Sequence, residues 1–216
     1  MNTSVSLLER LHWLGHDAFR LDGSPTIYFD PLRLEGQSSQ ADVILISHEH
    51  SDHCSPDDVK RIAGPETVIV ASPLAVKKLS GNVRTLRPGE RMAVGRVEIE
   101  AVPAYNVRRF RSPGVPFHPK ESEHVGFIVT VGGERVYFAG DTDYIPEMAE
   151  IDCDVALLPV GGTYTMDAKE AAQAVAAIGP KIAVPMHWGS GIVGTRADAE
   201  HFRSICNGQV AILEEE

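Results

Sequence analysis

The chain has 216 residues, of which 43% are hydrophobic and 23% charged, as is typical of a globular protein, and we expect one domain over residues 1–216. Its net charge of −10 argues against a general nucleic-acid-binding protein, and no apolar run is long enough to span a membrane. The first six residues lack the basic start and apolar core of a signal peptide, and three widely spaced cysteines fit a reducing compartment, so we expect a cytoplasmic protein.

The first third of the chain predicts a hairpin followed by buried strands. Residues 11–21 predict a strand interrupted by a glycine, and residues 26–31 predict its antiparallel partner. Apolar runs at 43–46 and 67–71 predict buried strands, with a helix from Ser55 to about Ala63 between them. Cys54, just before this helix, is predicted to be a small packing residue.

Three histidines and an aspartate directly follow the strand at 43–46: His48, His50, Asp52 and His53. Residues two apart on an extended segment point the same way, so His48 and His50 can approach one metal ion together. Asp52 and His53 lie further along, past the end of the extended segment, and can face a second ion. Imidazole and carboxylate ligands suit zinc, and also iron or manganese. A polar loop at a strand end is the structural alternative, but it leaves this density of metal ligands unexplained.

The middle of the chain predicts a short helix at 73–79, strands at 83–86 and 97–102, and a loop over residues 107–123, which are rich in arginine and proline. The loop carries Arg108, Arg109 and Arg111. The structural alternative is that these arginines lie on a solvent-exposed loop and have no functional role. The functional hypothesis is that at least one of these three guanidinium groups turns into the cleft and binds a phosphate or carboxylate of the substrate, with Arg108 and Arg109 as the substrate-binding candidates.

The second half predicts a hairpin at 125–131 and 135–139, followed directly by Gly140 and Asp141. Further along we expect strands at 155–160, 182–189 and 210–213, helices at 168–178 and 195–206, and a solvated tail at 214–216. His187 lies near the end of the strand at 182–189. Each half of the chain thus predicts a sheet with outer helices, and together they indicate an α/β protein with an αββα sandwich.

The run from His48 to His53 resembles the His-x-His-x-Asp-His signature of the metallo-β-lactamase superfamily, which has an αββα fold and commonly a two-metal hydrolytic site. Trp13-Leu14-Gly15-His16 and Phe29-Asp30-Pro31 resemble the branch that includes ascorbate-6-phosphate lactonase and N-acyl phosphatidylethanolamine phospholipase D. The resemblance implies that His16 and Asp30 lie beside the metal site, where Asp30 can orient a ligand histidine. It also implies a first metal ion on His48, His50 and a third histidine, a second ion on Asp52, His53 and His187, and Asp141 as the bridge between the ions.

The third histidine is where this chain departs from the family pattern. Its expected place holds Tyr105 and Asn106. His118, in the loop that follows, is our candidate for the missing ligand, and His124 is the alternative. Tyr105 and Asn106 are then expected to contact the substrate or to stabilise an oxyanion.

These features together predict a metal-dependent hydrolase. Two divalent ions, zinc or else manganese or iron, would lower the pKa of a shared water towards about 7. The metal-bound hydroxide would attack an ester, lactone or phosphodiester of a small substrate, anionic compounds among the candidates, with Asp52 as the catalytic hydrogen-bond acceptor. The alternatives are a one-metal enzyme and a metal-binding interaction module without catalysis, and the metal stoichiometry discriminates among them. A homo-oligomer is an open alternative to a monomer.

Overall fold

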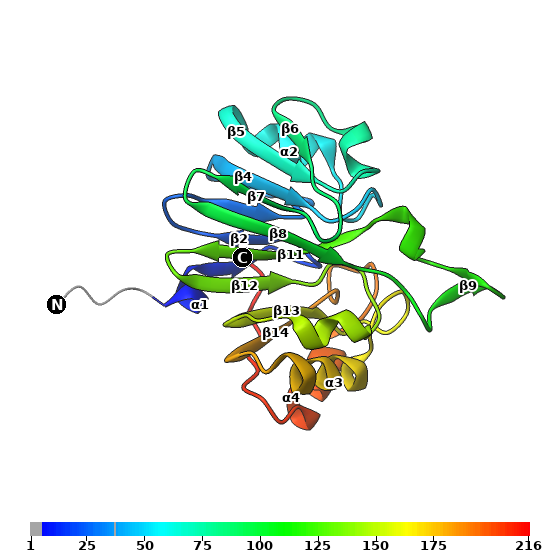
Figure 1. The fold of residues 1–216 in the computed structure, drawn as a ribbon. Coiled ribbons are helices and arrows are strands. Elements are labelled where there is room, and N and C mark those ends of the chain that lie inside the picture. The colour runs from blue at the N-terminus through cyan, green and yellow to red at the C-terminus, as the bar shows by residue number, and fades with distance from the viewer. Residues whose placement is uncertain (1–5, 37) are drawn as a thin grey trace.

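The first sheet is built from the N-terminal strands, in the order β1-β2-β3-β4-β5-β6 (Figure 1). Its strands β1 to β3 pair antiparallel, and β3 to β6 pair parallel. The computed structural model describes residues 6–36 and 38–216. Most of the first six residues, which lack the features of a signal peptide, therefore lie outside the described residues. The strands are β1 (Leu11–Trp13), β2 (Phe19–Leu21), β3 (Ile27–Phe29), β4 (Ala41–Ile46), β5 (Ala63–Ala71) and β6 (Val83–Thr85).

The second sheet has the order β14-β13-β12-β11-β8-β7. Strands β12 to β14 pair parallel, and the others pair antiparallel. A separate hairpin of β9 (Phe110–Ser112) and β10 (Val115–Pro116) projects from one side of the molecule (Figure 1). The strands of the second sheet are β7 (Arg91–Val94), β8 (Val97–Pro103), β11 (Val125–Val131), β12 (Glu134–Phe138), β13 (Val155–Pro159) and β14 (Ile182–Met186).

Helices cover the outer faces of both sheets, which confirms the predicted αββα sandwich: α2 lies outside the first sheet, and α3 and α4 lie outside the second (Figure 1). The α-helices are α1 (Leu7–Arg10), α2 (Pro56–Ile62), α3 (Ala168–Ile178) and α4 (Arg196–Ile205). The 3₁₀ helices are η1 (Ala75–Lys78), η2 (Lys120–Ser122) and η3 (Pro146–Glu150). In the ranges that the structure describes, no helix is both long and apolar enough to cross a membrane.

The core is divided by the alternation of side chains along the buried strands. On β4, Val43 and Leu45 face the core between the sheets, whereas Ile44 and Ile46 face the smaller cluster beneath α2. Cys54 packs into that smaller cluster, as predicted. Because every residue from Val43 to Ile46 is buried, β4 is held on both faces, and the histidine run that follows it starts from a rigid point.

Several details of the elements differ from the predictions. An additional edge strand, β7, was not predicted; its alternate residues are exposed, so its apolar pattern is weak. The loop at 107–123 contains the β9–β10 hairpin, and the helix expected at 73–79 is the 3₁₀ helix η1. Residues 210–213 form a single bridge, between Val210 and Ala183, in place of a strand. The tail at 214–216 is bound, since Glu215 bridges to Trp13 and the carboxylates on either side pair with arginines.

Phe138 connects the two sheets and provides a test of the core. Its ring, on β12, lies 5.3 Å from that of Phe29 and 6.4 Å from that of Phe19, both on the first sheet. We expect Phe138→Ala to lower the free energy of unfolding by about 3–5 kcal/mol, because the cavity cannot close between two sheets. Phe110→Ala, at a side chain 45% exposed on β9, should change it by less than about 0.5 kcal/mol. Urea unfolding measures both, and equal losses would contradict this packing.

Candidate metal centre

Loops that follow the strands of both sheets meet at one edge of the sandwich. Asp30 follows β3, the histidine run follows β4, Asp141 follows β12 and His187 follows β14. Carboxyl ends of parallel strands lie at the same edge of a sheet, which explains why segments far apart in sequence converge here. The backbone joins the two sheets at this edge, where the N–H of Val125 donates to the carbonyl of Ser47 at 3.2 Å.

A first group of three imidazoles faces one oxygen of Asp141. His118 Nε2 lies 3.2 Å from Asp141 Oδ2, and His48 Nε2 lies 3.9 Å from the same oxygen. His50 Nδ1 lies 3.1 Å from His48 Nε2 and 3.3 Å from His118 Nε2. Three ring nitrogens therefore converge on one point, and lone pairs this close repel each other unless a proton or a cation lies between them.

A second group faces the other oxygen of the same carboxylate. His53 Nε2 and His187 Nε2 each lie 3.2 Å from Asp141 Oδ1. Asp52 Oδ2 lies 3.8 Å from His53 Nε2, and its side chain is 26% exposed. Asp141 thus presents one oxygen to each group of imidazoles.

Hydrogen bonds at the far side of the rings orient the histidines. Asp30 accepts from His53 Nδ1 at 2.8 Å, and also from the backbone N–H and the hydroxyl of Ser47. Since the Ser47 hydroxyl donates to Asp30, it can accept from His48 Nδ1, 2.9 Å away. Asn106 Oδ1 lies 2.9 Å from His118 Nδ1 in the same way. In all three rings Nε2 is the nitrogen that faces Asp141, and it is the atom available to bind a metal ion once it has lost its proton.

The electrostatics of the centre favour bound cations. Burial alone would raise the pKa of Asp141, but the charges of His187, His53 and His118 hold it well below its usual value. Burial, with the charge of His53, holds the pKa of His48 well below its usual value. Burial lowers the pKa of His187, yet the charge of Asp141 outweighs it and raises that pKa. A proton on His187 therefore compensates the buried carboxylate, and a metal ion can replace it.

Polar atoms without a well-formed hydrogen bond collect at this edge. Among the described residues they include His53 Nε2, Asp141 Oδ1 and both ring nitrogens of His187. Buried polar atoms are normally paired, so this concentration indicates a missing positive partner. His187 and Asp30 also hold left-handed backbone conformations, with φ of 60° and 38°, a strain that clusters at functional sites. The His/Asp set fits divalent cations.

Tyr105 and Asn106 lie beside the first group, and their polar atoms are already engaged. The Tyr105 hydroxyl donates to Glu147, and Lys120 Nζ lies 4.6 Å from the centre of its ring. The Asn106 amide donates to Asp143 and to the carbonyl of Tyr164, while its oxygen faces His118. Asn106 thus contacts a candidate ligand directly.

The three arginines differ in environment. The Arg109 side chain is 13% exposed and lies among Asp143, Asp167 and Glu170, at 3.3 Å from Asp143 and 3.6 Å from Asp167. The Arg108 side chain is 63% exposed and pairs with Glu170 at 3.1 Å. Arg111 donates to the carbonyl of Phe117.

Two further groups lie against the centre. Asp17 was not predicted; it is fully buried, 3.5 Å from His53 Nδ1, and the Gly15-His16-Asp17 break in the first predicted strand was the available signal. His124, the alternative third ligand, turns its Nε2 towards Glu49 at 2.9 Å, although its ring lies 4.9 Å from that of His48. Burial lowers the pKa of His124 to about 4, so it is neutral at pH 7.

A two-sheet αββα sandwich with clustered histidines and aspartates at one edge defines a metal-dependent hydrolase of the metallo-β-lactamase superfamily. Residues 10–187 match the family model of the β-lactamase superfamily domain. The chain is 31% identical to a UPF0173 metal-dependent hydrolase of Thermoplasma acidophilum over 91% of this chain and 90% of the relative. It is 33% identical to one from Methanoculleus marisnigri, over 90% and 87%. The chain belongs to this UPF0173 metal-dependent hydrolase family.

A solved structure supports the same assignment. The crystal structure of a candidate metal-dependent hydrolase from Parabacteroides distasonis superposes with a TM-score of 0.80 and 34% identity. The match covers 95% of this chain and 93% of the other. The predicted family and fold are confirmed, whereas the finer resemblance to the lactonase and phospholipase D branch stays a prediction.

Arg109 provides a test of how the loop beside the centre is held. Arg109 is a largely buried cation that faces three carboxylates, and the carboxylate of Asp143 is fully buried, so we expect Arg109→Ala to lower the free energy of unfolding by about 3 kcal/mol. Arg111→Ala is the matched control, since its guanidinium is exposed and bonds to one carbonyl; a loss below about 1 kcal/mol is expected. Denaturant unfolding measures both. A stable Arg109→Ala protein with a raised KM for anionic substrates would instead assign Arg109 to substrate binding.

Proposed function

We propose that this protein uses two divalent metal ions to hydrolyse an ester, lactone or phosphodiester in a small molecule. The observation that carries the proposal is the division of the Asp141 carboxylate, with Oδ2 at 3.2 Å from His118 and Oδ1 at 3.2 Å from both His53 and His187. A carboxylate with one oxygen towards each of two imidazole groups suits a ligand shared by two ions.

Each group supplies imidazole and carboxylate donors of the kind that bind divalent metal ions in proteins. In this proposal His48, His50 and His118 hold the first ion, Asp52, His53 and His187 hold the second, and Asp141 joins them. Nitrogen-rich donors at the first site suit zinc, with iron or manganese as the alternatives. Ring-orienting contacts support the assignment, since the Nδ1 atoms of His48, His53 and His118 all have partners.

When bound, the two ions would polarise the scissile group and lower the pKa of a water to about 7. Asp52 is the residue placed to accept a hydrogen bond from that water, because it is ionised and partly exposed. Burial would raise the pKa of Asp52, but the imidazole of His16, with Nε2 at 3.5 Å from Asp52 Oδ2, and the charge of His53 lower it. Cys54 is no rival nucleophile, since burial raises its pKa to about 11 and keeps it a thiol.

Substrate binding is proposed on the side of the first group. Tyr105, Lys120 and His124, which lie next to the first group, line a cavity of about 200 Å³, and the proposed ligands themselves do not line it. Lys120 and the exposed Arg108 can attract an anionic substrate, whereas Asn106 is better placed to orient His118. The motifs shared with the lactonase and phospholipase D branch favour a phosphorylated lactone or a phosphodiester.

The cytoplasmic location and the homo-oligomer remain predictions.

Metal content and turnover test this function together. We expect about two equivalents of metal per chain, and activity on a panel of esters, lactones and phosphodiesters that a chelator removes and metal restores. His50→Ala should lower activity or metal affinity on the order of 100-fold while the fold survives, because its ring serves the site more than the core. The control is His201→Ala, an exposed histidine on α4. Full metal content and rate in His50→Ala would contradict the assignment, and one metal ion without turnover would support the interaction module.

The third ligand of the first ion has its own test. We expect His118→Ala to lower metal occupancy and His124→Ala to leave it unchanged. The reason is orientation, since His118 Nε2 faces Asp141 and His50, whereas His124 Nε2 faces Glu49. Metal analysis after dialysis against a weak chelator compares the two variants. Equal occupancy, or a greater loss in His124→Ala, would reverse the assignment.

A further inference from the structure

Asp17 is a buried carboxylate that the proposed ligand set does not use. Its side chain has no solvent exposure, and neither oxygen makes a well-formed hydrogen bond among the described residues. Its closest ion-pair contact is with His53 Nδ1, at 3.5 Å, but that nitrogen already has a shorter bond to Asp30, at 2.8 Å. Asp17 is therefore left without a full partner of its own.

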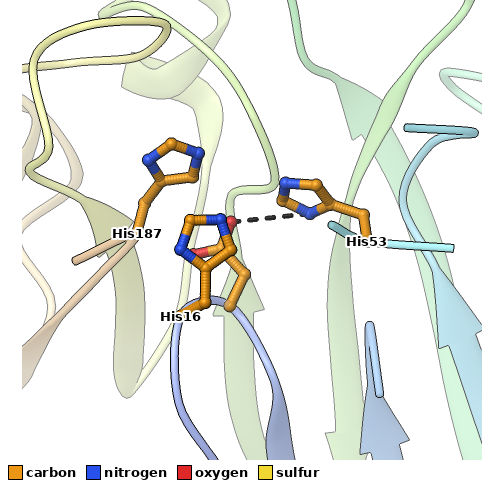
Figure 2. Close-up of side chains that lie close together, drawn as sticks. His16, His53 and His187 are labelled. Carbon is orange, nitrogen blue, oxygen red and sulfur yellow. Dashed lines mark ion pairs between the residues drawn. The ribbon is translucent and has the colours of Figure 1, made fainter. Parts of the chain in front are cut away.

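The surroundings of Asp17 are imidazoles and other carboxylates. Figure 2 shows His16, His53 and His187 gathered around one small space, and the His16 and His187 rings lie 4.4 Å apart. One donor atom from each of these three histidines and from Asp17 lies within 4.8 Å of the others. Both ring nitrogens of His16 also lack a well-formed hydrogen bond within residues 6–36 and 38–216. Unpartnered donors of a metal-binding kind thus share this space.

Neutral imidazoles cannot offset the negative charge of the carboxylates at this centre, so bound cations are needed. Asp17, Asp30, Asp52 and Asp141 lie in this region, and in the described residues all their ion-pair partners are histidines. Burying a carboxylate without a cation is costly. Four ionised carboxylates carry four negative charges, which two divalent ions would balance while every imidazole and the bound water are neutral. Removing Asp17 from this balance would leave an excess positive charge at the centre.

The backbone holds Asp17 in place at some cost. His16 has a left-handed φ of 51°, which turns the chain between β1 and β2 so that residue 17 enters the interior. The His16 carbonyl accepts from Trp13 Nε1 at 2.9 Å and from the N–H of His187 at 3.2 Å. Strain of this kind persists where the surrounding structure enforces it, commonly at functional sites.

We propose that Asp17 is a ligand of the second metal ion. The inference rests on the proposed function and extends its second site to five donors: Asp17, Asp52, His53, Asp141 and His187. His16 acts as a positioning residue, since its Nε2 lies 3.5 Å from Asp52 Oδ2. Catalytic zinc usually takes three protein ligands, whereas a larger set with several carboxylates suits manganese or ferrous iron. The second site therefore suits Mn²⁺ or Fe²⁺ better than the nitrogen-rich first site does.

The test compares Asp17→Asn with Glu170→Gln in the metal-free and Mn²⁺-loaded full chain. Glu170 is a matched buried carboxylate, but it pairs with Arg108 and Arg109. Asp17→Asn should retain about one equivalent of Mn²⁺ where the wild type retains two. Without metal it should melt at or above the wild-type temperature, because a buried charge is gone, and Mn²⁺ should raise its Tm less. Glu170→Gln should melt lower without metal and retain both equivalents.

Each outcome decides between the proposals. A wild type that binds no metal overturns the proposed function. A wild type with two equivalents, matched by Asp17→Asn with the same thermal gain, overturns only the role of Asp17. If the variant does not fold, the anomalous diffraction of a Mn²⁺-loaded wild-type crystal decides the question. An Asp17 oxygen at about 2.2 Å from the second ion supports the inference, and one beyond about 3.5 Å overturns it.

Discussion

The buried carboxylate of Asp141 is the interaction on which the rest of this edge depends. It extends from the second sheet and lies within 4 Å of imidazoles that come from both sheets and from the loop at 107–123. The chain just before Asp141 passes so close to strand β11 that residue 140 has to be a glycine. Gly140 has a φ of 62°, and a Cβ there would lie 2.9 Å from the carbonyl oxygen of Val125, the residue whose N–H donates to Ser47 and joins the sheets. Fold and site are therefore constrained by the same few atoms.

The same kind of hydrogen bond orients three of the rings around this carboxylate. An oxygen accepts at Nδ1, so that Nε2 is free to face inwards; Asp30 does this for His53, Ser47 for His48 and Asn106 for His118. The last case explains how an irregular loop can deliver a precisely placed imidazole. Asp143 accepts the backbone N–H groups of Val107, Arg108 and Arg109, and so holds the start of the loop. The largely buried Arg109 pairs with Asp143 and holds the loop at a second point.

Much of the fold was predictable because its signals are local. Buried strands such as β4 and β13 are continuous apolar runs, and α3 has its capping residue Asp167 and its terminating Gly179 at the predicted positions. The edge strand β7 escaped prediction because half of it faces solvent. The tail at 214–216 looked solvated because three consecutive acids carry no sign of their partners, Arg196 and Arg20. Those partners are remote in sequence, so only the fold brings them together.

The sequence by itself determined the kind of chemistry and most of its donors, because six metal-type side chains follow strand ends in a recognisable spacing. The fold class followed from the same reading, since strand and helix signals are periodic and local. Only the tertiary structure decided how the donors divide between the two oxygens of Asp141, and that His118 faces the centre while His124 turns to Glu49. It alone brought Asp17 to the centre and enclosed Arg109 among carboxylates. These are matters of side-chain direction and of burial between segments far apart in the chain, on which spacing along the sequence carries no information.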